Sequence, residues 1–488
     1  MSTSMSETTN ETLAPPSHPQ PAGAPHVDGG VWDSIREALR GSHRDFTEGS
    51  VARAIFVLAV PMVLEMLMES VFAVTDVFFV SKLGASAVAT VGLTESWITI
   101  VYALGMGLAI AASAMVARRT GERDREGAAH AGAQAIMLAL GVSLLLGVAG
   151  AMFAPKVLAV MGASPDVLAV GSTYARIMLG GNVTILMLFL INAIFRGAGD
   201  AVIAMRVLWL ANGINIVLGP CLIFGVGPFP RLGVTGAAIA TNIGRGTGAL
   251  FALSRLLKPG SRIDLHARHF RFDWDLTKRL VRIAWSAAFQ MLIGMGSWIA
   301  LTRVLATFGS AVVAGYTIGF RVIMFALLPA AGVANAAATM VGQALGAKKP
   351  DRAEHAVKLA GVYDMLVLSV VGAFLAIFAP NIARFFTTDW AISKVASDTM
   401  RVVSLGFPFY AWGMVLSQSF NGAGDTRTPT LLNLFVFWLW EIPLAYFLAI
   451  KLGLGPHGIY IAMTIAFSTL AIASAVIFRR GTWKMRRI

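Results

Sequence analysis

Three carboxylic acids, Glu65, Glu69 and Asp76, interrupt the first long apolar stretch of the chain. At about 100° of helical rotation per residue, Glu69 lies about 40° from Glu65, and Asp76 returns to within about 20° of it. The three acids therefore share one face of the predicted helix. Because an ionisable group inside a membrane is costly, this face is a candidate for binding a proton or a sodium ion. Pro61 lies on the same face and permits a bend there.

Other polar residues complete the predicted cation-coupling set. They are Glu95, early in the second apolar segment, and Asn192, Asn215 and Thr241 in the fourth to sixth segments. Buried amides and hydroxyls in membrane helices either join neighbouring helices by hydrogen bonds or coordinate an ion or a proton-linked water. From the sequence both interpretations stay open.

The composition indicates a membrane protein. Apolar residues make up 56% of the 488 residues and charged residues only 13%, against about a quarter in a soluble domain. The net charge of +13 does not indicate nucleic-acid binding, because the basic residues concentrate in short loops beside apolar segments. The single cysteine, Cys221, excludes an internal disulfide and a thiolate metal site.

Twelve apolar segments are long enough to cross about 30 Å of hydrocarbon. They span residues 53–81, 86–117, 127–152, 167–197, 201–225, 233–256, 277–307, 312–345, 353–378, 393–421, 428–450 and 457–478. Residues 1–50 precede them as a polar, proline-rich tail, predicted to be disordered and cytoplasmic, with a short amphipathic helix over residues 31–39. The sequence thus predicts a polytopic membrane protein.

Residues 225 apart match along almost the whole chain. Gly197–Asp200 recurs as Gly422–Asp425, for example. A duplication this long predicts an all-α membrane protein with twelve transmembrane helices in two six-helix lobes, related by a pseudo-two-fold axis along the membrane normal. The predicted parts are an N-lobe (53–257), a basic cytoplasmic connector (258–276), a C-lobe (277–479) and a basic cytoplasmic tail (480–488). Most Lys and Arg residues lie in loops after even-numbered segments or in the tails, so both termini are predicted to be cytoplasmic.

The repeat breaks at the acidic face. Glu65, Glu69 and Asp76 correspond to Gln290, Gly294 and Leu301, so cation coupling is predicted for the N-lobe. Two further embedded acids in the second half, Asp364 and Glu441, are equally well interpreted as partners of neighbouring arginine residues.

Several motifs in this order give the chain a family resemblance. They are Pro61 with Asp76 and Lys82–Gly84, then Phe195–Asp200, Asn215–Leu218, Gly236–Thr241 and Gly342–Gly346. Over residues 53–480 the chain resembles the multidrug and toxic compound extrusion (MATE) family, and within it the DNA-damage-inducible branch of prokaryotic members. The resemblance implies a cofactor-free antiporter of the bacterial inner membrane, which expels organic, often cationic or amphipathic, compounds in exchange for H⁺ or Na⁺. It maps the family's first-helix aspartate onto Asp76, its helix-bending proline onto Pro61, and its amide and hydroxyl onto Asn215 and Thr241.

The sequence departs from that family pattern at two places. Many members of the branch place an aspartate where this chain has Gly219. The acids that another branch uses in the seventh and tenth helices are also missing from the cores of those helices. The resemblance therefore leaves Glu65, Glu69 or Glu95 as the partner of Asp76.

The substrate route is expected between the lobes, lined by adaptable aromatic, amide and thioether side chains. The candidates are Trp97, Phe289, Gln290, Met291, Trp298, Phe320 and Met324. We expect the chain to act as a monomer on small organic compounds within the lipid bilayer. The alternatives are a flippase for lipids or lipid-linked saccharides, which would favour an arginine-rich cavity, and an intramembrane enzyme. The sequence offers no nucleophile and base at one depth for the enzyme.

Overall fold

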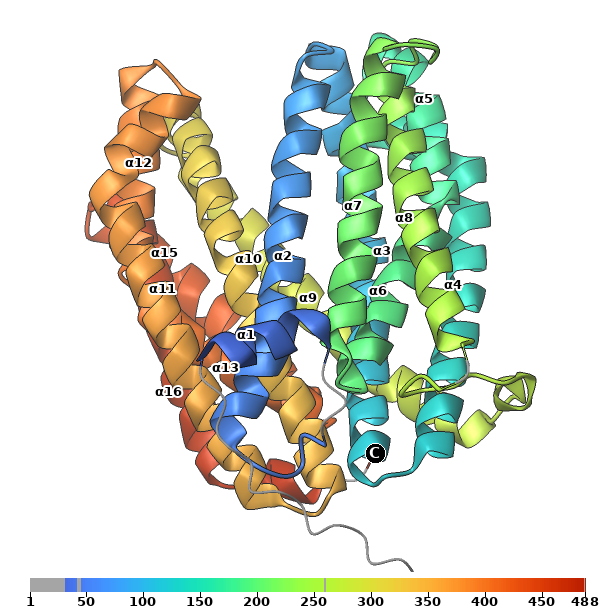
Figure 1. The fold of residues 1–488 in the computed structure, drawn as a ribbon. Helices are drawn as coiled ribbons and strands as arrows, with labels where there is room; N and C mark the ends of the chain where they lie inside the picture. The colour runs from blue at the N-terminus through green and yellow to red at the C-terminus, as the bar shows by residue number, and fades with distance from the viewer. Residues whose placement is uncertain (1–30, 42–44, 259, 487) are drawn as a thin grey trace, which may run out of the picture.

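The computed structural model describes residues 31–41, 45–258, 260–486 and 488, which are almost entirely helical. Two groups of long helices stand apart at the upper end of Figure 1 and converge at the lower end. The N-lobe contains α2 (Val51–Ser81), α3 (Ala85–Gly121), α4 (Arg125–Val160), α5 (Pro165–Gly180), α6 (Asn182–Gly197), α7 (Ala201–Phe224) and α8 (Val234–Leu256). The C-lobe contains α9 (Trp274–Ala306), α10 (Ser310–Gly346), α11 (Pro350–Phe386), α12 (Trp390–Ser404), α13 (Phe407–Gly422), α14 (Arg427–Asn433), α15 (Ile442–Tyr446) and α16 (Pro456–Arg479). Two π-helical segments, η2 (Leu434–Glu441) and η3 (Phe447–Lys451), flank α15, and short 3₁₀ helices η1 (Ala267–Phe270) and η4 (Thr482–Met485) lie outside the lobes.

The twelve predicted segments are confirmed as helical, with ends shifted by up to eight residues. Within the described residues, ten of them are long and apolar enough to cross a membrane, α5 and α6 counting together. The other two are α8, which contains Arg245, and the interrupted pair α12 and α13.

Two of the predicted segments are interrupted at equivalent places in the repeat. Gly181 separates α5 from α6, and Gly406 lies between α12 and α13. A Cβ atom on Gly181 would lie 2.1 Å from Asn242 Oδ1, so the absent side chain leaves room for this amide. The repeat is also visible in the backbone, because Gly199 and Gly424 have φ angles of 81° and 80° and both end a helix in the left-handed region.

Hydrophobic cores show how the lobes are joined. We call the side with the loops 122–124, 198–200, 257–273, 347–349 and 423–426 the basic end, and the opposite side the far end. At the far end each lobe has its own core. At the basic end, Ala54–Met62 of α2 pack with α10, α11, α13 and α16 of the C-lobe. Conversely, Leu276–Ala284 of α9 pack with α3, α4, α6 and α7 of the N-lobe. The repeat-related helices α2 and α9 therefore each begin in the core of the opposite lobe.

Small residues bring the lobes into close contact near the basic end. A Cβ atom on Gly107 would lie 2.4 Å from Ala284 O, one on Gly332 2.6 Å from Val63 N, and one on Gly121 1.9 Å from Gln343 O. Gln343 Nε2 also donates to Gly197 O at 2.9 Å across the same seam. The lobes are therefore closed at the basic end.

Gly121→Ala is expected to disfavour this closed arrangement by about 1–3 kcal/mol, because the added methyl group overlaps a backbone carbonyl. Thermal unfolding of the purified protein and spin-label distances between the lobes measure the effect. Gly92→Ala on the same helix is the control, since nothing lies within 4 Å of its Cβ position. Equal unfolding temperatures and equal interlobe distances in Gly121→Ala and Gly92→Ala would contradict the close packing at Gly121.

The tail prediction needs correction for its described part. A helix, α1 (Val31–Arg40), lies where the sequence predicted a short amphipathic helix. Residues 45–50 fold against the helix ends, and Phe46 is only 4% exposed. Disorder is therefore wrong for residues 31–41 and 45–50, because a buried aromatic ring and a set of polar contacts hold them; residues 1–30 and 42–44 lie outside the described residues.

Candidate cation and substrate site

Two acids of α2, Glu65 and Glu69, contact side chains of the N-lobe. Pro61 lies where α2 leaves the C-lobe core, and the acids follow it toward the far end. Trp209 Nε1 on α7 donates to Leu64 O at 3.1 Å and fixes the helix just after the proline. The acids therefore lie in the half of α2 that packs in the N-lobe.

Glu65 is held by a buried ion pair. Arg196 Nη1 on α6 donates to Glu65 Oε1 at 2.6 Å, and Asn192 Nδ2 donates to the same oxygen at 3.3 Å. Glu65 is 1% exposed. Because a buried carboxylate needs a cationic or hydrogen-bonding partner, this pair accounts for both the acid and the predicted amide.

Glu69 has two partners from other helices. It accepts a hydrogen bond from Asn212 Nδ2 at 2.9 Å, and Arg245 Nη2 on α8 lies 3.8 Å from it. Arg245 is buried, donates to Tyr102 Oη at 2.7 Å and lies over the ring of Phe72 at 5.5 Å. Aromatic faces and Glu69 together compensate the charge of this guanidinium.

Asp76 has a different environment. It is half-buried, and among the residues that the structure describes it has no direct hydrogen bond or ion pair with another side chain. Arg245 and Glu95 are close enough to interact with it electrostatically, and Tyr174 lies close to both acids. Asp76 is therefore the first-helix acid that remains available to an ion or a cationic compound.

Asn215 and Thr241, which both belong to the predicted cation-coupling set, are in contact. Asn215 Nδ2 donates to Thr241 Oγ1 at 2.9 Å between α7 and α8. A Cβ atom at Gly219 would meet only Asn215 Oδ1, at 3.7 Å, so the aspartate of the resembled branch is replaced here by free space. The amide–hydroxyl pair joins two helices and leaves Asn215 Oδ1 beside that space.

Charged residues from both lobes face each other in the far half. Glu95 on α3 and Arg321 on α10 are both exposed and close enough to interact electrostatically. Trp298 of α9 stacks on Phe320 of α10, with ring centroids 5.6 Å apart. The far half of the molecule therefore contains an acid and a base from different lobes and a pair of stacked aromatic rings in the C-lobe.

The remaining substrate candidates are spread over several environments. Trp97 is 39% exposed and Phe289 is 47% exposed, while Met291 and Met324 are half-buried. Gln290 is buried, and its Oε1 has no hydrogen-bond partner among the described residues. The structure brings Trp298 and Phe320 into contact, and Phe320 also packs against the C-lobe core.

The two C-lobe acids have no arginine partner within the described residues. Glu441 accepts a hydrogen bond from Ser297 Oγ at 3.1 Å, and both carboxyl oxygens of Asp364 are buried without a hydrogen bond. The interpretation as ion pairs is therefore wrong for this part of the chain. Buried pairs of an acid and an arginine occur in the N-lobe instead, at Glu65 with Arg196 and at Glu69 with Arg245.

Sequence reasoning missed the arginines of the site. Arg196, Arg245 and Arg321 approach Glu65, Glu69 and Glu95. Arginine inside a membrane helix is as costly as an acid, so the same argument could have identified Arg245 and Arg321. Their pairing with particular acids depends on helix neighbours far apart in the chain.

Comparison with known proteins agrees with this architecture. The MatE family model matches residues 61–221 and 286–447, more than half of the chain. "Probable multidrug resistance protein NorM" of Thermotoga maritima is 23% identical over 438 residues, covering 90% of this chain and 94% of that protein. "Multidrug export protein MepA" of Staphylococcus aureus is 24% identical over 436 residues, covering 88% and 94%.

The fold also matches solved structures. An outward-facing conformation of a multidrug resistance MATE family transporter of the MOP superfamily aligns with a TM-score of 0.85 and 28% identity, over 90% of this chain and 98% of that one. The twelve-helix, two-lobe fold and the resemblance to the MATE family are thereby confirmed, while the branch within the family stays a prediction; transport rather than enzymatic catalysis is the family's activity. The chain belongs to the MatE family of multi-pass membrane transporters.

Proposed function

We propose that the chain is a secondary active antiporter, which exports organic, cationic or amphipathic compounds in exchange for H⁺ or Na⁺ by alternating access. The observation that carries this proposal is the difference between the acids of α2. Arg196 and Arg245 hold Glu65 and Glu69, whereas Asp76 is half-buried and has no direct side-chain partner among the described residues. The multidrug resistance and multidrug export activities for which the NorM and MepA relatives are named support organic compounds as the substrate class.

Competition at Asp76 supplies the coupling. While Asp76 is ionised, the N-lobe site attracts a cationic compound. An ion that neutralises Asp76 weakens this attraction, so ion and compound lower each other's affinity. Glu65, Glu69, Asn192, Asn215 and Thr241 act as positioning groups that fix α2, α6, α7 and α8 around it.

The helix α2 transmits the change to both lobes. Its first turns pack in the C-lobe core and its acidic half packs in the N-lobe. Pro61 removes the backbone donor that would bond to the carbonyl of Val57, so bending at this point is less costly. The repeat-equivalent position in α9 is Ser286, which gives only α2 a proline hinge at this point.

Trp298 and Phe320 provide the substrate surface in this mechanism. Their stacked rings suit a planar apolar group, while Glu95 and Asp76 suit a positive charge. The basic end would face the cytoplasm of a bacterial inner membrane, with both chain termini on that side. One chain contains both lobes, so a monomer suffices for alternating access.

Pro61→Ala is expected to slow transport roughly threefold or more, because restored backbone bonding stiffens the hinge. The initial rate of efflux from vesicles measures this, with Pro155→Ala in α4 as the control for proline loss in a membrane helix. An unchanged rate in Pro61→Ala would remove the hinge from the mechanism.

Transport in reconstituted vesicles tests the proposed function. The full chain is placed in liposomes with the aromatic cation ethidium, and proton and sodium gradients are imposed separately. We expect ethidium to move against its own gradient with one of these ions, and to stop when an ionophore dissipates that gradient. Ethidium movement that ignores both gradients would contradict antiport, and gradient-independent exchange of a fluorescent lipid would favour the flippase.

A further inference from the structure

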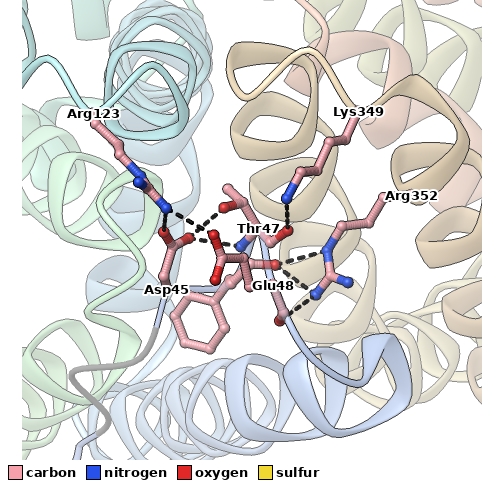
Figure 2. A network of polar contacts seen from close by, with 7 residues as sticks. Asp45, Thr47, Glu48, Arg123, Lys349 and Arg352 are labelled. Atoms are coloured by element: carbon pink, nitrogen blue, oxygen red, sulfur yellow. Dashed lines mark hydrogen bonds and ion pairs between the residues drawn. The ribbon is translucent and has the colours of Figure 1, made fainter. Parts of the chain in front are cut away.

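The segment Asp45–Gly49, which we call the strap, contacts both lobes at the basic end. Figure 2 shows it between Arg123, in the loop after α3, and Lys349 with Arg352, at the start of α11. The strap is thus placed across the seam where the lobes meet. The candidate site on α2 lies elsewhere and does not use it.

The N-lobe contact of the strap is ionic. Arg123 Nη2 donates to Asp45 Oδ2 at 3.1 Å and to Glu48 Oε1 at 2.8 Å (Figure 2). Asp45 Oδ1 also accepts hydrogen bonds from the backbone and hydroxyl of Thr47, at 2.9 and 2.5 Å. These bonds fold the strap into a turn that presents both acids to one guanidinium.

The C-lobe contact uses backbone carbonyls of the strap. Lys349 Nζ donates to Thr47 O at 3.0 Å, and Arg352 donates to Phe46 O at 2.8 Å, Glu48 O at 2.8 Å and Gly49 O at 2.7 Å. One guanidinium can reach the carbonyl groups of Phe46, Glu48 and Gly49 only while the turn is folded. The two contacts therefore depend on the same local conformation.

Phe46 anchors the strap between the lobes. Its ring is 4% exposed and joins the core formed by α2, α10 and α11. The guanidinium of Arg262, from the segment between α8 and α9, lies 5.2 Å from the ring centroid. Burial of this ring adds an apolar contact to the charged ones.

The strap lies near the pseudo-symmetry axis. Arg123, which bonds the strap, and Lys348, the neighbour of Lys349, are 225 residues apart. Both have a left-handed backbone, with φ angles of 60° and 58°. Gly121 and Gln343, which touch across the seam, come just before these two turns. Separation of the lobes at this end would pull Arg123 away from Lys349 and Arg352, so the strap cannot keep both contacts.

We propose that the strap is a latch, which holds the basic ends of the two lobes together and must release one lobe before the transporter opens at this end. The strap thereby sets the ratio between the conformation closed at the basic end and the conformation open there. The residues before it contact the N-lobe, since Arg206 of α7 donates to carbonyls of Leu39 and Arg40, and Glu37 of α1 accepts from Arg53 at the start of α2 at 2.9 Å. The latch therefore stays near the seam after release.

The latch is expected to work independently of pH near neutrality. Burial alone would raise the pKa of Asp45, but the hydrogen bonds from Thr47 and the Arg123 guanidinium lower it below its usual value of 3.8. The contact is then complete above that usual pKa and is lost only as the pH falls through the lowered one. The charged groups around Asp45 are Arg123, Glu48, Lys349, Arg352 and Arg262.

Spin-label distances between the lobes test the latch. In a Cys221→Ser background, labels are placed at the exposed positions Arg125 and His355, near the basic ends of α4 and α11. We expect Asp45→Asn with Glu48→Gln to raise the population with separated basic ends about three- to tenfold, and Phe46→Ala at least about tenfold. The effect should be the same at pH 6 and pH 8.

The matched control for the strap variants is Glu122→Gln, in the loop after α3 that also contains Arg123. Glu122 pairs with Arg119 at 3.0 Å and has no ion pair with the described residues of the strap. Unchanged unfolding temperatures show that the variants are folded, and the distances require no substrate or coupling ion. Strap variants with the distance distribution of the wild type would overturn the latch, whatever the vesicle experiment shows about antiport.

Discussion

Asp76→Asn is expected to lower ion-driven efflux by about 5–150-fold, because the neutral amide cannot exchange its charge with an ion. Asp76 is the acid of α2 without a direct side-chain partner among the described residues, so its substitution breaks no ion pair. The protein should therefore fold normally, lose coupling to the ion and bind the cationic compound less tightly. Efflux of ethidium from vesicles, driven by the effective ion gradient, measures this loss.

Two comparisons separate coupling from binding in this variant. Exchange of ethidium across the membrane without any ion gradient should persist in Asp76→Asn, since it requires lobe movement but no ion. Glu95→Gln should reduce coupling less, because Glu95 is exposed and the positive charge of Arg321 offsets part of its own. Full gradient-driven efflux by Asp76→Asn would remove Asp76 from the coupling site.

Arg196→Ala is expected to give the largest loss of stability, about 3–5 kcal/mol, because it leaves Glu65 as an unpaired charge in the protein interior. Arg196 and Glu65 are joined at 2.6 Å, and both are buried. Thermal unfolding of the detergent-purified protein measures the loss. The combined variant Glu65→Gln with Arg196→Met should recover most of it, because neither residue then carries a charge.

An exposed ion pair supplies the control for the buried one. Arg119 and Glu122 are 3.0 Å apart at the surface of the basic end, where such pairs contribute about 0–1 kcal/mol. Arg119→Ala should therefore change the unfolding temperature little. A similar small change in Arg196→Ala would mean that Glu65 is neutral or finds another partner.

The sequence predicted the fold well because its signals were local or strictly periodic. Apolar length identifies a membrane segment, and the 225-residue offset identifies two similar lobes. The common face of Glu65, Glu69 and Asp76 follows from helical geometry, and the structure places the first two against N-lobe partners. These features need no knowledge of which helices are neighbours.

The distinction between the acids could not be predicted in the same way. Arg196 and Arg245 are far from Glu65 and Glu69 in the chain, and only helix packing brings them together. The exchange of the first turns of α2 and α9 between the lobes is likewise a property of packing, not of chain order.

The polar tail shows a further limit of composition. Few apolar residues predict disorder, yet one buried ring and the backbone carbonyls of Phe46, Thr47 and Glu48 suffice to fix the strap. Backbone acceptors are present in every sequence, so composition does not reveal where basic side chains will use them. The donors, Lys349 and Arg352, lie about 300 residues later in the chain, at the start of α11 in the C-lobe.

Ion release on substrate binding tests the central claim most directly. Ethidium is added to the purified full chain in weakly buffered solution, and released protons are counted with a pH indicator; displaced sodium is counted with a sodium-selective electrode. Reciprocal coupling predicts that ethidium releases one of these ions from the wild type and that Asp76→Asn releases none of it. Equal ion release by the wild type and Asp76→Asn, or none by the wild type while ethidium binds, would contradict antiport through Asp76.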